Sequence, residues 1–458
     1  MRHRAANASA DIIRLSASPV PTAITRLMVF APHCDDETLG CAGRIQQTLA
    51  SGGTVRVAIL TNGDGYPTAV ERQLRCLRAG PNEFRQFAAL RQDESLHALQ
   101  SLGVSSQNVF FFGYPDRGLL SLWNDHWTPD SLYTSPFTRC SASPYANTFH
   151  AGSHYCGRDI VEDIKATLRA FHPTIVTVTH PAEDHTDHAA AAAFVTLALL
   201  ELQSDPRDAG WARQTRLEYY LIHRGDWPAP SGAMPNSPLH PPAAMTRTNT
   251  HWTSFPLTSE QVAQKAHSIE LYPSQTTVMP TFLKSFIRCS ELFGEMPAGR
   301  LAVVPEGAIH VNADTADWNS LSPALLDPVR DNVLRDLQGG GDIRALTLCR
   351  DSRNLYVRLD TRQPISKRFL YTLHLRLFDS EGVTGTRDAM FKLSPNASKN
   401  KSVRIASRDR MMEIAIPWEL LTRNMHAKPV QTLSVSMETT LSGVEIDKTG
   451  IRFLTLNE

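Results

Sequence analysis

The chain has 458 residues, more than one hydrophobic core usually organises, and its composition (42% hydrophobic, 20% charged) is that of an ordinary soluble globular protein. We therefore expect two domains. Lysine plus arginine (46) equals aspartate plus glutamate (46), which removes the long-range attraction that a nucleic acid or an anionic membrane would need, so no nucleic-acid partner is expected.

The N-terminal stretch MRHRAANASADIIRLSASPVP is basic but lacks the apolar core of about seven residues that a secretory signal needs. The longest apolar run, Ala189 to Leu200, is shorter than the roughly 18 residues of a membrane span. Seven scattered cysteines without a CxxC pair argue against a disulfide framework and against a structural zinc knuckle. We expect a soluble, cytoplasmic protein with no membrane span.

After an N-terminal extension (1–23), residues 24–300 alternate short apolar runs with helical patterns. The strand-like runs lie at 24–31, 54–60, 108–113, 173–180 and 217–223, and helical patterns lie between them, for example at 93–103 and 158–172. This alternation predicts an α/β domain with a Rossmann-like, mostly parallel sheet and helices on both faces. In such sheets, ligands bind beyond the carboxyl ends of the strands.

From about residue 305 the pattern changes to short alternating strands. Residues 342–363 alternate apolar and polar side chains on both sides of RDSRN, which indicates a hairpin. Further strands are expected at 369–379, 402–409, 412–417 and 432–438. We predict an all-β sandwich domain over residues 305–458.

The first polar motif is APHCDDETLG, residues 31–40, which directly follows a predicted strand and opens a helix. The three-residue spacing of His33 and Asp36 on a strand-to-helix turn can aim an imidazole and a carboxylate at one point. The alternative is that Asp36 simply caps the helix.

The second motif is HPAEDHTDH, residues 180–188, again between a strand and a helix. His185 and His188 are three residues apart and share one face of the first helical turn. Together with His33 and Asp36, His188 completes a set of two histidines and one carboxylate. This set leaves a position for water, the ligand pattern of catalytic zinc.

Asp35 and His185 are then left for catalysis. Asp35 could take a proton from water whose pKa zinc has lowered to roughly 7. His185 could face the substrate carbonyl as a cation or hydrogen-bond donor and stabilise the oxyanion. HxxD and HxxH are common motifs that usually mark surface residues or caps, but their occurrence at two strand-to-helix junctions favours metal-assisted hydrolysis of an amide or ester.

APHCDDETLG and HTDH resemble the paired signatures of the PIG-L/LmbE family of zinc-dependent de-N-acetylases. The similarity continues in order through most of residues 24–295, at segments 60–65, 91–103, 111–119, 220–228 and 272–294. The resemblance implies a Zn²⁺ cofactor and removal of an N-acetyl or similar acyl group. It also implies a substrate that carries an N-acyl amino sugar, either a small molecule or a glycoconjugate.

By position, the resemblance implies metal ligands His33, Asp36 and His188, the general base Asp35, and the charged or proton-donating partner His185. It also suggests that Arg91 and Asp116 help to hold the sugar. The alternatives are a helix-surface ion pair of Arg91 with Glu94, and an Asp116 that only shapes a turn. His223, at a strand end, either reaches the site or is a hydrogen-bonded structural histidine.

Two features depart from the family pattern. Cys34 replaces the usual proline, and we expect its thiol to point into the core; a further hypothesis is that oxidation or metal ligation at Cys34 tunes activity. Residues 119–156 form a long aromatic-rich segment, which predicts a wall of the substrate cleft. In that wall Trp123, Trp127 or Tyr133 would be available to stack on a sugar ring.

The C-terminal strands resemble family 9 carbohydrate-binding modules, which implies that this domain tethers a glycan or covers the catalytic cleft. Trp318 and Trp418 could be sugar platforms, but a sandwich usually buries its tryptophans, so we expect both in the core. Two other functions stay open for the whole chain. One is a two-histidine, one-carboxylate iron enzyme, and the other is a carbohydrate-binding protein with a vestigial metal site.

Overall fold

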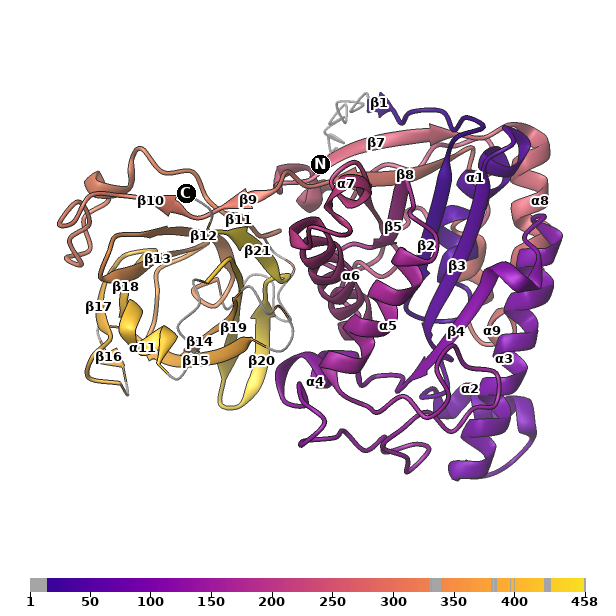
Figure 1. Ribbon diagram of the computed structural model, residues 1–458, viewed down its shortest axis with the longest axis horizontal. Helices are drawn as coiled ribbons and strands as arrows, with labels where there is room; N and C mark the ends of the chain where they lie inside the picture. The colour runs from indigo at the N-terminus through magenta and orange to yellow at the C-terminus, as the bar shows by residue number, and fades with distance from the viewer. Residues whose placement is uncertain are drawn as a thin grey trace, which may run out of the picture.

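The computed structural model describes residues 15–329, 331, 339–379, 382, 385–395, 397–398, 400–423 and 430–456. Most of the predicted N-terminal extension, residues 1–14, lies outside this description. Figure 1 shows two parts side by side: an α/β part, residues 15–295, and a β part, residues 299–456.

One eight-stranded sheet, in the order β1-β7-β8-β6-β5-β2-β3-β4, runs through the α/β part. The strands are β1 (Ser16–Ala17), β2 (Arg26–Ala31), β3 (Thr54–Thr61), β4 (Val109–Tyr114), β5 (Ile175–Thr179), β6 (Arg216–Tyr220), β7 (His251–Pro256) and β8 (Ser290–Glu295). The five strands from β6 to β4 are mutually parallel, whereas β8 is antiparallel to both β6 and β7. The predicted mostly parallel sheet is confirmed, and each predicted strand overlaps an observed one.

Helices cover both faces of this sheet, as predicted. They are α1 (Asp36–Ala50), α2 (Pro67–Leu74), α3 (Pro81–Ser101), α4 (Leu119–Asn124), α5 (Gly157–Arg169), α6 (Thr186–Ser204), α7 (Ala209–Ala212), α8 (Ser259–Glu270), α9 (Pro273–Thr276) and α10 (Pro280–Lys284). In Figure 1, α5 and α6 lie on the face toward the β part, and α1, α3 and α8 lie on the other. Each face has its own apolar core. None of the described helices combines the length and apolarity needed to cross a membrane.

The β part consists of two sheets that share one apolar core. The first sheet contains β10 (Ala302–Val303), β11 (Leu325–Leu326), β12 (Ile343–Arg350), β13 (Asn354–Thr361), β17 (Arg404–Arg408) and β18 (Met411–Pro417). The second contains β9 (Gly299–Arg300), β14 (Leu370–Phe378), β15 (Thr386–Ser394), β16 (Ala397–Ser398), β19 (Thr432–Leu441), β20 (Val444–Lys448) and β21 (Arg452–Thr455). A short helix, α11 (Trp418–Thr422), follows β18. The predicted hairpin is β12–β13, with Arg350 opposite Leu355.

The two parts meet through aromatic side chains of the 119–156 segment. Trp123 and Trp127 are only 4% and 5% exposed. Both pack against Phe378 of the β part, and the guanidinium carbon of Arg376 lies 4.1 Å from a ring centroid of Trp127. The prediction that these tryptophans are available to a sugar ring is therefore wrong, because the β part covers them.

The two tryptophans singled out in the β part have different surroundings. Trp318 is buried, and its indole Nε1 donates to Glu413 Oε1 over 2.9 Å. Trp418 is half-buried against the edge of the core, with Arg350 above its ring. The expected burial is confirmed for Trp318 and partial for Trp418.

Candidate metal centre

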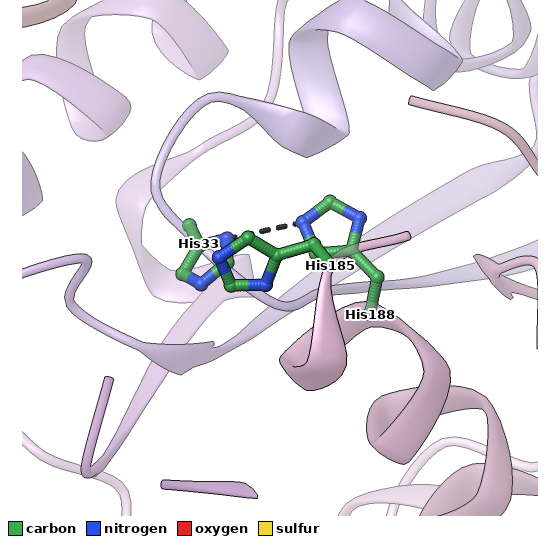
Figure 2. A group of neighbouring side chains, drawn as sticks. All are labelled: His33, His185 and His188. Carbon is green, nitrogen blue, oxygen red and sulfur yellow. Dashed lines mark hydrogen bonds between the residues drawn. The ribbon is translucent and has the colours of Figure 1, made fainter. Parts of the chain in front are cut away.

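Both polar motifs lie at the same edge of the α/β sheet. β2 leads into the turn before α1, and β5 leads into the turn before α6. Because β2 and β5 are neighbouring parallel strands, their carboxyl ends bring the two turns together. Figure 2 shows the result: His33 from one turn faces His185 and His188, which project from the start of α6.

Three side-chain atoms converge at this point. His33 Nδ1 is 3.1 Å from His188 Nε2, and Asp36 Oδ2 is 3.3 Å and 3.2 Å from these two nitrogens. All three side chains are buried. Tetrahedral zinc with bonds of about 2.0–2.1 Å holds its ligands roughly 3.3 Å apart, so the triangle fits such an ion. Asp36 is not the N-cap of α1, because that position belongs to Asp35.

Carboxylates lie beside the outer nitrogens of both imidazoles. His33 Nε2 is 3.3 Å from Asp116 Oδ1 and 3.3 Å from Asp187 Oδ2. His188 Nδ1, which has no hydrogen-bond partner among the described residues, lies 3.7 Å from Glu183 Oε2. Such carboxylates fix the ring orientation of metal-binding histidines. Sequence reasoning missed Asp187 and Glu183, although both stand inside the second motif, and it gave Asp116 a sugar contact or a turn.

Arg91 is buried beneath this site rather than on the helix surface. Its Nη2 is 3.2 Å from Asp35 Oδ2, and its Nη1 donates to the carbonyl of Gly63 over 2.9 Å. Glu94 instead accepts hydrogen bonds from the backbone and hydroxyl of Ser274. The surface ion pair between Arg91 and Glu94 is therefore the wrong alternative.

Asp35 occupies a strained backbone position. It has φ 138° and ψ −29°, a backbone conformation that residues other than glycine rarely adopt and that costs about 1–3 kcal/mol. Its N–H donates to Glu37 Oε2 over 3.0 Å, and Glu37 in turn accepts from the Tyr272 hydroxyl. Burial raises the pKa of the Asp35 carboxyl, and the Arg91 guanidinium opposes that rise. Strain of this kind concentrates at functional sites.

His185 and His223 complete the cluster of imidazoles. His185 Nδ1 accepts from the N–H of Asp187 at the start of α6, which leaves the ring proton on Nε2. Burial and the neighbouring histidines lower the pKa of His185 to about 2, which favours the neutral form of the ring. The His223 ring stacks on Phe282, with its centroid 5.0 Å from that of His188. His223 therefore does reach the site.

Two further predicted residues lie close by. Cys34 is fully buried, which confirms that its side chain points into the core, and burial raises the pKa of its thiol. Tyr133 is half-buried at Gly118, and burial, followed by the charges of Asp187 and Asp116, raises the pKa of its hydroxyl. Of the three aromatic residues proposed to stack on a sugar, Tyr133 is the one whose hydroxyl is influenced by the charges of Asp116 and Asp187, which contact His33.

A family model described as PIG-L: GlcNAc-PI de-N-acetylase matches residues 28–199, which include both motifs. A search of curated proteins finds no match to the chain. Similar solved structures include a conserved protein from Thermus thermophilus (22% identity, TM-score 0.34, covering 57% of this chain and 84% of that one). They also include N,N'-diacetylchitobiose deacetylase from Pyrococcus horikoshii (16%, 0.36, 60% and 84%) and 4-carboxy-2-hydroxymuconate hydratase from Pseudomonas putida (14%, 0.34, 57% and 83%). Residues 28–199 thus form a domain of the PIG-L family.

Proposed function

We propose that the α/β part is a zinc-dependent hydrolase that removes an N-acetyl or similar acyl group from an amino sugar or its conjugate. The observation that carries this proposal is the convergence of His33 Nδ1, Asp36 Oδ2 and His188 Nε2 within 3.3 Å of one another. The description of the matching family, a de-N-acetylase of an N-acetylglucosamine lipid, supports an N-acylated amino sugar as the substrate group.

The residues around the triangle keep its donor atoms ready for a metal. Asp116 and Asp187 lie 3.3 Å from His33 Nε2 and favour a ring proton there, so that Nδ1 would offer its lone pair to a bound metal. When bound, zinc supplies a Lewis acid that polarises the acyl oxygen and lowers the pKa of water toward neutrality.

Asp35 is the proposed general base. It takes a proton from the attacking water and returns it to the leaving nitrogen as the C–N bond breaks, so that the products are a carboxylate and a free amine. Arg91 contacts Asp35 at 3.2 Å and holds the carboxylate in place. Burial raises the pKa of Asp35, which strengthens it as a proton acceptor.

His185 is the proposed oxyanion donor. Because its Nδ1 accepts a backbone N–H, its Nε2–H is the ring atom left to donate to the acyl oxygen as negative charge develops there. His223 and Tyr133 border the same cluster and are the proposed contacts to the sugar. We assign Arg91 a positioning role, because its guanidinium already contacts Asp35 and Gly63.

The test is acetate release from a panel of N-acetylated amino sugars by zinc-reconstituted protein. Asp35→Asn should lower turnover by about 10² or more with zinc content unchanged. Asp93→Asn, which changes an exposed carboxylate on α3, is the matched control. Activity that requires iron and oxygen would favour the oxygenase alternative, and sugar binding without acetate release would favour a vestigial site. Either outcome would contradict the proposal.

A further inference from the structure

A second cluster of possible metal ligands lies where the two parts of the molecule meet. Asp327 follows β11, Asp331 lies four residues further on, and Asp447 belongs to β20. One carboxylate oxygen from each of the three lies within 4.8 Å of the others. None of these residues belongs to the PIG-L motifs or to the proposed catalytic machinery.

The cluster contains oxygens that the protein itself leaves unsatisfied. Asp327 is 7% exposed, and its Oδ2 has no hydrogen-bond partner within the described ranges. The same is true of the buried Asp331 Oδ1. Asp447 uses its two oxygens to accept from the N–H groups of Ile343 (2.7 Å) and Lys448 (2.9 Å), but each carboxylate oxygen has a further lone pair. A buried polar oxygen without a partner costs free energy, and a ligand bound to these oxygens would offset that cost.

The charge balance points to a cation. Arg224 forms an ion pair with Asp331, but its other Nη lies 2.7 Å from Asp184 Oδ1, so it is shared between two carboxylates. Burial, followed by repulsion from neighbouring aspartates, raises the pKa of both Asp327 and Asp447. With three clustered carboxylates and one shared arginine, a divalent cation would bring the cluster close to neutrality.

The ligand chemistry and the access route favour calcium. Carboxylate oxygens are the ligands of hard cations. Three oxygens within 4.8 Å of one another lie no more than about 2.8 Å from a common point, close to the Ca–O distances of about 2.3–2.6 Å. A cavity of about 250 Å³, lined by Asp327, Asp331 and Asp447 among others, provides an entry path and room for water ligands. We propose that Asp327, Asp331 and Asp447 form a structural Ca²⁺ site on the side of the β part that meets the α/β part.

Such a site would act on the junction and on the loop beside the catalytic histidines. The ion would tie the segment after β11 to β20, and Arg224 carries the connection from Asp331 to Asp184, next to His185. Arg224 also directly follows His223. Ca²⁺ is thus expected to stabilise the arrangement of the two parts, while the zinc ligands remain separate.

The experiment titrates CaCl₂ into zinc-reconstituted full-length protein, by calorimetry and by thermal unfolding. We expect one Ca²⁺ per chain and an increase of several degrees in Tm, because a ligand that binds only the folded state stabilises it. MgCl₂ at the same concentration should have a smaller effect, because Mg²⁺ gives up its water ligands reluctantly. His33→Ala, which removes a zinc ligand, should keep the full response to Ca²⁺.

Asp327→Asn tests the location of the site without relying on loss of folding. Without Ca²⁺ this variant should be at least as stable as the wild type, because one repelling carboxylate is gone, yet it should lose the Ca²⁺-dependent rise in Tm. Glu445→Gln, on the same strand as Asp447 and lining the same cavity, is the control that should keep the rise. An equal Ca²⁺ response in Asp327→Asn overturns the proposal. The proposal is also overturned if Ca²⁺ leaves the Tm of the wild type unchanged but acidification raises it. The three aspartates would then be stabilised by shared protons and not by a cation.

Discussion

Arg91 on α3 and Asp35 in the turn before α1 form a buried ion pair, with 3.2 Å between Nη2 and Oδ2. A lysine cannot reproduce the fork of donors that reaches both Asp35 and the Gly63 carbonyl. We predict that Arg91→Lys lowers kcat by about 10–10² through a misplaced base, with KM and bound zinc nearly unchanged. Steady-state kinetics and metal analysis test this, with the exposed Arg72→Lys as control. A rise in KM at constant kcat would instead show that Arg91 binds the substrate.

The carboxylates behind the histidines should control zinc affinity. Asp187 contacts His33 Nε2 and accepts the N–H groups of Arg117 (2.6 Å) and Leu119 (3.0 Å). Asp187→Asn keeps the size of the side chain but removes its charge, so we predict a fall of about 10–100-fold in zinc affinity. Competition with a chromogenic chelator measures this directly. Asp93→Asn should bind zinc as the wild type does, and an unchanged affinity in Asp187→Asn would argue against His33 as a ligand.

Trp127 should matter for stability and not for the substrate. It is buried at the junction, where Arg376 of the β part lies over its ring at 4.1 Å. Trp127→Ala leaves a cavity beside Phe378 and removes one of the two rings that the buried Arg376 guanidinium contacts, so we predict a loss of about 3–5 kcal/mol in the free energy of unfolding. Chemical denaturation measures the loss. The KM of the folded fraction should stay constant, whereas Tyr133→Ala should raise it.

The sequence predicted the parts of the site that depend on local spacing. His33 and Asp36, and separately His185 and His188, each stand on one strand-to-helix turn, and the parallel pairing of their strands brings the turns together. The fold class could be predicted too, because the alternation of strand and helix patterns is also a local property of the sequence.

What the sequence could not predict depends on contacts between distant segments. The burial of Trp127 requires knowing that the β part packs against the 119–156 segment. The pairing of Arg91 with Asp35 joins residues 56 positions apart, and a helical repeat offers Glu94 as the nearer partner. For the same reason, deletion of residues 305–458 is no clean test of a carbohydrate-binding role, because it would expose the apolar surface around Trp123 and Trp127.

His180, which is not one of the proposed zinc ligands, makes stability depend on pH. It is buried, its Nδ1 accepts from the N–H of Ala182 (3.0 Å), and its Nε2 lies 2.8 Å from Thr250 Oγ1. Burial, with a smaller contribution from Arg224, lowers the pKa of His180 to about 3. In the unfolded chain His180 therefore becomes protonated below about pH 6.5, whereas in the folded protein it stays neutral down to about pH 3.

The sign of the effect follows from this difference in bound protons. The contribution of His180 to the free energy of unfolding is fully present above about pH 6.5. It decreases as the pH falls, by about 2 kcal/mol between pH 7 and pH 5. His180→Asn keeps an acceptor for the Ala182 N–H but cannot be protonated. The difference in the free energy of unfolding between wild type and variant should therefore be about 2 kcal/mol smaller at pH 5 than at pH 7. Urea unfolding at both pH values measures the gap, and His267→Asn, at an exposed position on α8, is the control. Parallel pH profiles for wild type and His180→Asn would mean that the pKa of His180 in the folded protein is close to its ordinary value.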